Sequence, residues 1–171
     1  MAAAPHEFIR SMKHPVKFRM FLFLKLPSAY LAGVRIKDIN EHACSVTVPY
    51  KWLSQNPFRS TYFACLAMAA EMSTGALAMA HLYKRKPPVS MLVTKLAAEY
   101  HKKAVGRTIF TCEDGDNQNA TIEKAIASGE GQEFTARSTG RNEAGEVVAV
   151  FFITWSFKAR EIKNREIKNG K

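Results

Sequence analysis

A single carboxylate lies within the longest apolar run of this chain. The run extends from Tyr62 to Tyr83, and Glu71 is its only acidic residue. Burial disfavours the charged form of a carboxyl group and raises its pKa, which makes the carboxylate a more effective general base near neutral pH. Glu71 is therefore the first candidate for chemistry. Two alternatives remain open: a structural acid that caps a backbone group or pairs with a basic residue, and a group that orients a ligand without turnover.

The same run predicts one long helix. It is rich in Ala and Met, which favour helix, and contains no Pro. Because it is apolar nearly all round, we expect burial on most faces. Its length would also suit a membrane span, but a charge such as that of Glu71 costs about 2.5–3.5 kcal/mol at the bilayer centre. We therefore expect a core helix wrapped by a sheet, with small side chains that let strands approach closely.

Strand patterns flank this helix on both sides. Val34–Ile39 and Cys44–Val48 alternate apolar and polar residues, as half-buried strands do. The later candidates are Val89–Tyr100, Gly106–Cys112, Gln132–Ser138 and Val147–Phe157, with an acidic turn at Glu113–Gln118 and a short helix at Ala120–Ala127. Within the strand candidate Val89–Tyr100, the segment Lys95–Glu99 is also compatible with a helix. Since the strands come in runs, we predict an α+β fold with an antiparallel sheet of five to six strands.

The two ends of the chain are basic. Phe8–Leu26 reads as one amphipathic helix with five basic residues, and packing on the domain is favoured over contact with a membrane surface. The C-terminal end repeats the motif Arg-Glu-Ile-Lys-Asn, and we read it as a solvated tail. The expected organisation is an N-terminal helix in residues 1–27, one domain in 28–158 and a basic tail in 159–171.

Composition narrows the class of protein. The 171 residues carry a net charge of +10, which favours an anionic partner. The tail lacks the aromatic residues or charge density of a nucleic-acid arm, so nucleic acid is not expected. The three cysteines show no CxxC pairing, so neither a metal site nor a disulfide framework is predicted. Free thiols favour a reducing compartment, the cytoplasm.

Three local motifs resemble those of a known family. They are Pro27–Ile36, Asn56–Ala64 and Ala69–Glu71. Together with the order of elements, they are similar to the thioesterase-like hotdog proteins grouped as DUF4442, in which a curved antiparallel sheet wraps a central helix. The resemblance covers roughly Leu24 to Phe157. It implies a homodimer with acyl-thioester pockets at the subunit interface, and it leaves open whether dimers pair into tetramers.

The resemblance also implies roles for individual residues. In related thioesterases an acid on the central helix, here Glu71, acts as nucleophile or general base. A backbone N–H eight residues earlier, here that of Phe63, polarises the thioester carbonyl, and an amide side chain, here Asn56, assists. Tyr62 takes a position that is often histidine. For Asn56 an Asx turn is the alternative, and for Tyr62 it is packing.

The chain departs from the family pattern near Phe63 and again four residues after Glu71. Phe63, Arg59 and Ala64 stand where related sequences favour glycine. The polar side chain expected four residues after the acid is replaced by Gly75. Its neighbour Thr74 is therefore the candidate for that contact with substrate.

Basic residues are concentrated after the long helix. The candidates for binding the phosphates of coenzyme A are Lys84, Arg85, Lys86, Lys102, Lys103 and Arg107. Cations at a helix C-terminus also oppose the helix dipole, which is the alternative reason for the first three. No cofactor is expected, because coenzyme A would enter as part of the substrate.

The function predicted from these observations is hydrolysis of an acyl-CoA or related thioester. A non-catalytic module that binds acyl-CoA or fatty acid is the alternative, since glycines are missing around Phe63. A third hypothesis, suggested by the charged ends, is association with nucleic acid or a membrane.

Overall fold

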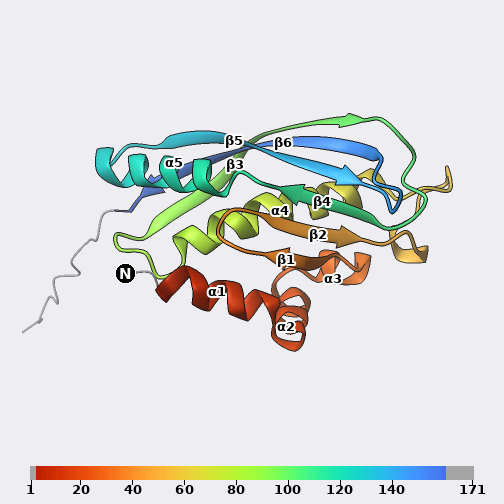
Figure 1. Ribbon diagram of the computed structural model, residues 1–171, viewed down its shortest axis with the longest axis horizontal. Coiled ribbons are helices and arrows are strands. Elements are labelled where there is room, and N and C mark those ends of the chain that lie inside the picture. Colours follow the sequence, from red (N-terminus) through yellow and green to blue (C-terminus); the bar gives the residue numbers. More distant parts are fainter. Residues whose placement is uncertain (1–2, 161–171) are drawn as a thin grey trace, which may run out of the picture.

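Three helices precede the sheet. The computed structural model describes residues 3–160, and the helices are α1 (Ala3–Lys13), α2 (Pro15–Lys25) and α3 (Pro27–Ala32). The prediction of one helix over Phe8–Leu26 was wrong: His14 is extended and caps α2, which begins at Pro15. This break has a local cause, because proline pushes the residue before it out of the helical region. Helix α1 packs against α4 and β1, along the lower edge of the domain in Figure 1.

The sheet has six strands in the order β1-β2-β4-β5-β6-β3, and every neighbouring pair is antiparallel. The strands are β1 (Arg35–Ile39), β2 (Cys44–Val48), β3 (Val89–Tyr100), β4 (Thr108–Cys112), β5 (Gln132–Arg141) and β6 (Val147–Ala159). In β2 and β4 buried residues alternate with half-buried ones, so one face of each strand points into the core. The predicted α+β class is confirmed.

The long helix α4 (Phe63–Leu82) forms the centre of the core. It contacts β1, β2, β4, β5 and β6 and lies within the curve of the sheet (Figure 1). Ala69, Ala70 and Ala80 are fully buried, which lets the strands come close to the helix backbone. Helix α4 is long and apolar enough to cross a membrane, but 67% of its most apolar 18-residue segment is buried inside the fold. Its apolar surface is therefore used in the domain core.

Helix α5 (Gly115–Ser128) is longer than the sequence predicted. It begins at Gly115, inside the expected acidic turn, where the chain passes very close to the turn between β1 and β2. A side chain at Gly115 would stand 2.1 Å from the carbonyl oxygen of Glu41, so only glycine fits. A short 3₁₀ helix, η1 (Trp52–Ser54), precedes the loop that leads into α4.

Strand β3 lies at one edge of the sheet. All of its 12 residues, including Lys95–Glu99, are extended, and β6 is its only partner among residues 3–160. Leu92 is 67% exposed and Leu96 is 51% exposed. Strand β6 ends at Ala159, and residues 161–171 of the predicted basic tail lie outside the described part of the chain.

Candidate active site

The carboxyl group of Glu71 lies half-buried in the middle of α4. Its side chain has no hydrogen-bond or ion-pair partner among residues 3–160, and burial alone raises its pKa above the usual range. Oε1 occupies the space left by Gly75, because a methyl group there would stand 3.2 Å from it. The same methyl group would stand 3.1 Å from Cζ2 of Trp155. The acid is therefore held in the gap beside an indole ring.

Two cavities meet the Glu71 carboxyl group. The smaller has a volume of about 90 Å³. Apart from Glu71 its lining is apolar and comes from α1, α2, β1, α4, β3 and β6: Phe8, Met12, Phe18, Phe21, Leu26, Ile36, Met72, Gly75, Ala76, Met79, Met91 and Trp155. The larger, of about 270 Å³, lies between the α2–α3 junction and α4. This arrangement suits an apolar group placed next to the acid.

Thr74 supports the acid from within the core. Its Oγ1 donates to the backbone carbonyl of Glu71 at 3.0 Å and accepts a hydrogen bond from Nε1 of Trp155 at 3.0 Å. Gln118 donates through Nε2 to the carbonyl of Thr74 at 3.2 Å. The hydroxyl of Thr74 is fully buried and lines neither cavity at Glu71. This network fixes the indole ring, and it leaves Thr74 no contact with either cavity.

The N-terminus of α4 presents free backbone donors. Tyr62 is the N-cap residue and offers no side-chain cap. The N–H groups of Phe63 and Ala64 have no acceptor within residues 3–160. Such groups lie at the positive end of the helix dipole and can stabilise a negative charge. Tyr62 and Phe63 are 45% and 57% exposed, and their rings pack edge to face with centroids 4.9 Å apart.

Asn56 is held in a turn by its side-chain oxygen. Oδ1 accepts hydrogen bonds from the N–H of Phe58 at 3.0 Å, and from the N–H and hydroxyl of Ser60, both at 3.2 Å. The predicted Asx turn is therefore present. These three donors fix the amide orientation, and Nδ2 has no acceptor among the described residues. Asn56, Tyr62 and Phe63 line one cavity of about 530 Å³, which we call the donor cavity.

The acid and the donors do not share a cavity within one chain. Phe63 precedes Glu71 by eight residues, which separates them by about 12 Å along the helix axis and by about 80° around it. Glu71 is not among the residues that line the donor cavity. A single copy of the chain therefore brings Asn56, Tyr62 and Phe63 together, and places Glu71 elsewhere.

The basic candidates are divided between the two ends of α4. Lys84, Arg85 and Lys86 line a cavity at its C-terminal end, whereas Lys102 and Lys103 line the donor cavity at its N-terminal end. The 12-residue strand β3 separates the two groups by about 40 Å. Within one copy of the chain, these candidates for binding phosphate therefore do not surround a single site.

Several of these cations already have partners. Lys84 pairs with Glu7 at 2.7 Å, Arg85 pairs with Glu123, and Lys102 pairs with Glu146. Within residues 3–160, Lys86, Lys103 and Arg107 form no ion pair. Of the two lysines that line the donor cavity, Lys103 is the one without an ion pair among residues 3–160.

The remaining reactive groups lie apart from these cavities. Burial raises the pKa of all three thiols, that of Cys112 to about 12, so none is a ready nucleophile. His81 is buried and bonds through Nε2 to the carbonyl of Glu41 at 3.0 Å. No group of three or more His, Cys, Asp or Glu side chains that could hold a metal occurs in residues 3–160.

Sequence reasoning missed the residues that surround the acid. Trp155 comes from β6, and Phe8 and Phe18 come from α1 and α2. Tyr100 and His101, at the end of β3, line the donor cavity. Trp155 lies within the predicted strand Val147–Phe157, but only the tertiary fold shows that it lines the same cavity as Glu71.

The comparisons with known proteins agree on the fold. The sequence profile of a family described as "Domain of unknown function (DUF4442)" matches residues 16–157. No curated protein matches the sequence.

Solved structures resemble the chain over most of its length. A protein from Pseudomonas aeruginosa, described as a probable thioesterase, superposes with a TM-score of 0.73 at 18% identity and covers 88% of this chain and 99% of its own. A protein of unknown function from Chlorobaculum tepidum gives 0.72 at 15%, with coverages of 92% and 98%. A thioesterase from Haemophilus influenzae gives 0.60 at 13%, with coverages of 82% and 88%. The sheet wrapped around α4 is thus the hotdog fold, as the sequence predicted.

Proposed function

The chain belongs to the DUF4442 family, and from this premise we propose that it is a thioesterase that hydrolyses acyl-CoA or a related acyl-thioester. One observation carries the proposal: the Glu71 carboxyl group has a raised pKa, lacks a partner among residues 3–160, and opens on an apolar cavity. An acyl chain suits that cavity, and Glu71 suits the role of base or nucleophile. The thioesterases among the structural neighbours share this fold.

The hydrolysis requires two kinds of group at the thioester. The N–H of Phe63 and the Nδ2 group of Asn56 would donate to the carbonyl oxygen and stabilise the negative charge that develops on it. Glu71 would take a proton from water, whose oxygen attacks the acyl carbon, or would attack that carbon itself. On the base route the C–S bond then breaks, the sulfur takes up a proton and leaves as free thiol, and the acyl group leaves as carboxylic acid. On the nucleophile route the thiol leaves first, the acyl group stays on Glu71 as a mixed anhydride, and water then hydrolyses the anhydride to the carboxylic acid and restores Glu71.

The separation of acid and donors supports a homodimer with shared sites. Strand β3 presents an unpaired edge with exposed leucines, and such an edge can pair with a second copy. Met91, near the start of β3, lines a cavity at Glu71, whereas Tyr100, at its end, lines the donor cavity. Antiparallel pairing of two β3 strands would set these ends side by side, so the acid of one subunit would face the donors of the other.

The phosphates of coenzyme A would lie at the rim of the donor cavity. Lys103 is the nearest free cation, Arg107 follows in the same loop, and Lys102 would have to release Glu146. Lys84 and Arg85 already form ion pairs within their own chain, with Glu7 and Glu123. The buried, unpaired thiols suit the cytoplasm as the site of action.

The test is release of free thiol from short, medium, long and aromatic acyl-CoAs by the full chain. We expect wild-type turnover with at least one class, and a loss of about 10²-fold or more in Glu71→Gln. Glu130→Gln, which removes an exposed acid that lines neither the donor cavity nor the cavities at Glu71, is the matched control and should keep full activity. Absence of turnover with every class by folded wild-type protein would overturn the proposal.

A second candidate, binding of acyl-CoA without hydrolysis, is favoured by one observation. No polar side chain accompanies Glu71 in the smaller cavity, since Gly75 has none and Thr74 bonds inside the core. Nothing in that cavity besides Glu71 would therefore position a water molecule. Tight binding of a non-hydrolysable acyl-CoA ester by wild type, with no thiol released from acyl-CoA, would select this candidate.

A further inference from the structure

The N-terminal helices form a strongly basic part of the molecule. Between Phe8 and Lys37 the sequence contains seven basic residues and no acidic one. Only one of these seven, Lys13, forms an ion pair with a carboxylate in residues 3–160, with Asp38 at 2.9 Å. The other six form no ion pair within the described part of the chain. The proposed thioesterase chemistry uses none of them.

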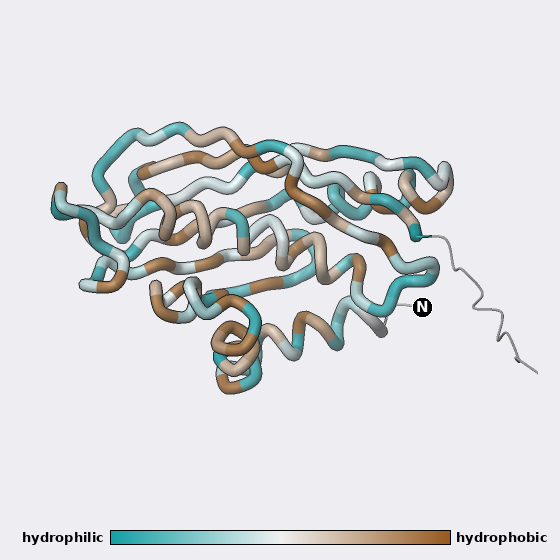
Figure 2. The backbone as a smooth tube through the Cα atoms, turned by 180° about the vertical axis from the view of Figure 1, so that it is seen from behind, coloured by the Kyte–Doolittle hydropathy of each residue, from teal (hydrophilic) through white to brown (hydrophobic). Residues whose placement is uncertain are grey.

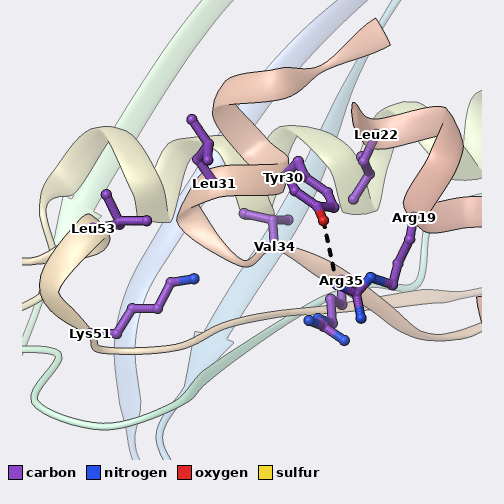
Figure 3. Close-up of a pocket in the computed structure, with 8 residues that line it drawn as sticks. All are labelled: Arg19, Leu22, Tyr30, Leu31, Val34, Arg35, Lys51 and Leu53. Carbon is purple, nitrogen blue, oxygen red and sulfur yellow. Dashed lines mark hydrogen bonds between the residues drawn. The ribbon is translucent and has the colours of Figure 1, made fainter. Parts of the chain in front are cut away.

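Three cations surround one pocket in this region. Arg19 of α2, Arg35 of β1 and Lys51 before η1 line a pocket of about 230 Å³, and no acidic residue lines it (Figure 3). The hydroxyl group of Tyr30 accepts a hydrogen bond from Arg19 at 3.4 Å, and this contact lowers the pKa of the phenol. The floor is apolar and includes Val34. Cations from three separate elements with no acid between them form a binding site for an anion such as a phosphate group.

Large apolar side chains are exposed around this pocket. On α2, Val16, Met20, Phe23 and Leu24 are 65%, 56%, 61% and 66% exposed, and on α3 Leu31 is 54% exposed. In Figure 2 helix α2 is mostly brown, the colour of hydrophobic residues, with hydrophilic residues in teal between them. The ring of Phe23 lies 5.4 Å from that of Tyr30, and Leu31 lines the pocket itself. The exposed apolar residues are therefore continuous with the anion pocket.

Exposed apolar side chains beside cations favour the surface of an anionic bilayer, because binding there gains from both buried apolar area and attraction to the headgroups. A second copy of the chain would fit this surface poorly. In a two-fold interface the same patch faces itself, so the unneutralised cations of α2 and β1 would oppose their own copies. Anionic lipid headgroups carry the negative charge that would neutralise the cations of α2 and β1.

We propose that α2 and α3 bind the surface of an anionic phospholipid bilayer, with one headgroup phosphate held between Arg19, Arg35 and Lys51. The exposed side chains Met20, Phe23 and Leu24 enter the boundary between headgroups and acyl chains. This proposal does not depend on the proposed function, because Met20, Phe23 and Leu24 line neither cavity at Glu71.

The test is cosedimentation of the full chain with vesicles of phosphatidylglycerol and phosphatidylcholine, compared with phosphatidylcholine alone. We expect binding to the first, weakened by salt, and none to the second. Arg19→Gln/Arg35→Gln/Lys51→Gln should weaken binding about tenfold or more. Lys124→Gln/Arg137→Gln/Lys158→Gln removes the same charge from exposed positions on α5, β5 and β6, and should bind nearly as wild type. Phe23→Ser/Leu24→Ser should also weaken binding while keeping the charge.

Three results would overturn the proposal. The first is no binding to anionic vesicles by wild type. The second is an equal loss in both triple variants, which would show attraction by net charge alone. The third is a change of oligomeric state in Phe23→Ser/Leu24→Ser, measured by light scattering, which would show that the patch contacts a second copy. Melting temperatures close to wild type confirm that the variants are folded.

Discussion

Oε1 of Glu71 lies 3.2 Å from the position that a methyl group on Gly75 would occupy, one helical turn further along α4. The missing side chain at Gly75 thus makes room for the carboxyl group, and Trp155 closes the other side of the gap, 3.1 Å from the same point. The resemblance to related thioesterases leads us to expect a polar side chain at position 75. Because Gly75 has no side chain, the carboxyl group of Glu71 has an apolar surrounding there. Burial in turn raises the pKa of Glu71.

Gly75→Ala should displace the carboxyl group and lower thiol release from acyl-CoA by about tenfold or more, since small misplacements of a reacting group are costly. The better helix propensity of Ala, worth about 1 kcal/mol, offsets part of the overpacking cost of about 1–3 kcal/mol. The free energy of unfolding should therefore fall by no more than about 2 kcal/mol. Gly131→Ala is the matched control, because its nearest neighbour would be 3.9 Å away. Full activity in Gly75→Ala would contradict this view of the gap.

The raised pKa of Glu71 makes a prediction about stability. The folded protein holds this proton more tightly than the unfolded chain, so stability falls as the pH rises from the usual glutamate pKa through the raised one. Glu71→Gln should therefore melt at a higher temperature than wild type above that window, and at a similar temperature below it. Thermal melts across the pH range measure this difference. A lower melting temperature for Glu71→Gln at neutral pH would show a stabilising partner for the carboxylate.

The same pKa predicts an acid limb for activity. Because the carboxylate is the reactive form, kcat/KM should fall as Glu71 becomes protonated, with an apparent pKa above that of an exposed glutamate. A pH profile of thiol release by wild type tests this expectation. A limb at the usual glutamate pKa would assign the titration to another group.

The backbone donor of Phe63 can be removed without removing the helix. Phe63 is the first residue of α4, where proline is well tolerated, and Tyr62 before it is already extended with ψ 133°. Phe63→Pro should lower kcat about 10²–10³-fold, as loss of an oxyanion donor does. Phe63→Ala keeps the N–H and should keep most of the activity. Equal activity of the two variants would remove the backbone N–H from the mechanism.

Pairing through β3 can be tested by charge. Leu92→Glu/Leu96→Glu places acids on the exposed edge strand and should give a 19.2 kDa monomer in light scattering, where wild type gives twice that mass. Activity should be lost with the dimer, because each site would need two subunits. Val16→Glu changes an equally exposed residue on α2 and should remain dimeric. A wild-type monomer with full activity would refute shared sites.

Local patterns predicted most of the sheet and the core helix. The alternation in Cys44–Val48 and the all-round apolar composition of α4 are properties of a few consecutive residues, and both elements are present. The break between α1 and α2 also had a local signal in the sequence, the proline at position 15. We predicted one helix because the amphipathic pattern continues across this proline. The start of α5 also had a local signal, since its N-cap is Asp114, but the close approach of Gly115 to the backbone of Glu41 depends on the tertiary fold.

The site was predictable only in part, for the same reason. The burial of Glu71 followed from its neighbours in sequence, and the free N–H of Phe63 followed from its place at a helix start. The contact with Trp155 joins two elements that are distant in the chain. The cations near residues 84 and 103 are close in sequence, but an extended strand of 12 residues carries them to opposite ends of α4.

Mixing two inactive variants tests most directly whether the acid of one subunit works with the donors of the other. Glu71→Gln retains the donors, and Phe63→Pro retains the acid. After subunit exchange, half of the dimers are mixed, and each mixed dimer contains one intact site, so we predict recovery of about a quarter of wild-type thiol release. Mixtures that form mixed dimers and stay as inactive as the separate variants would contradict a site shared between subunits.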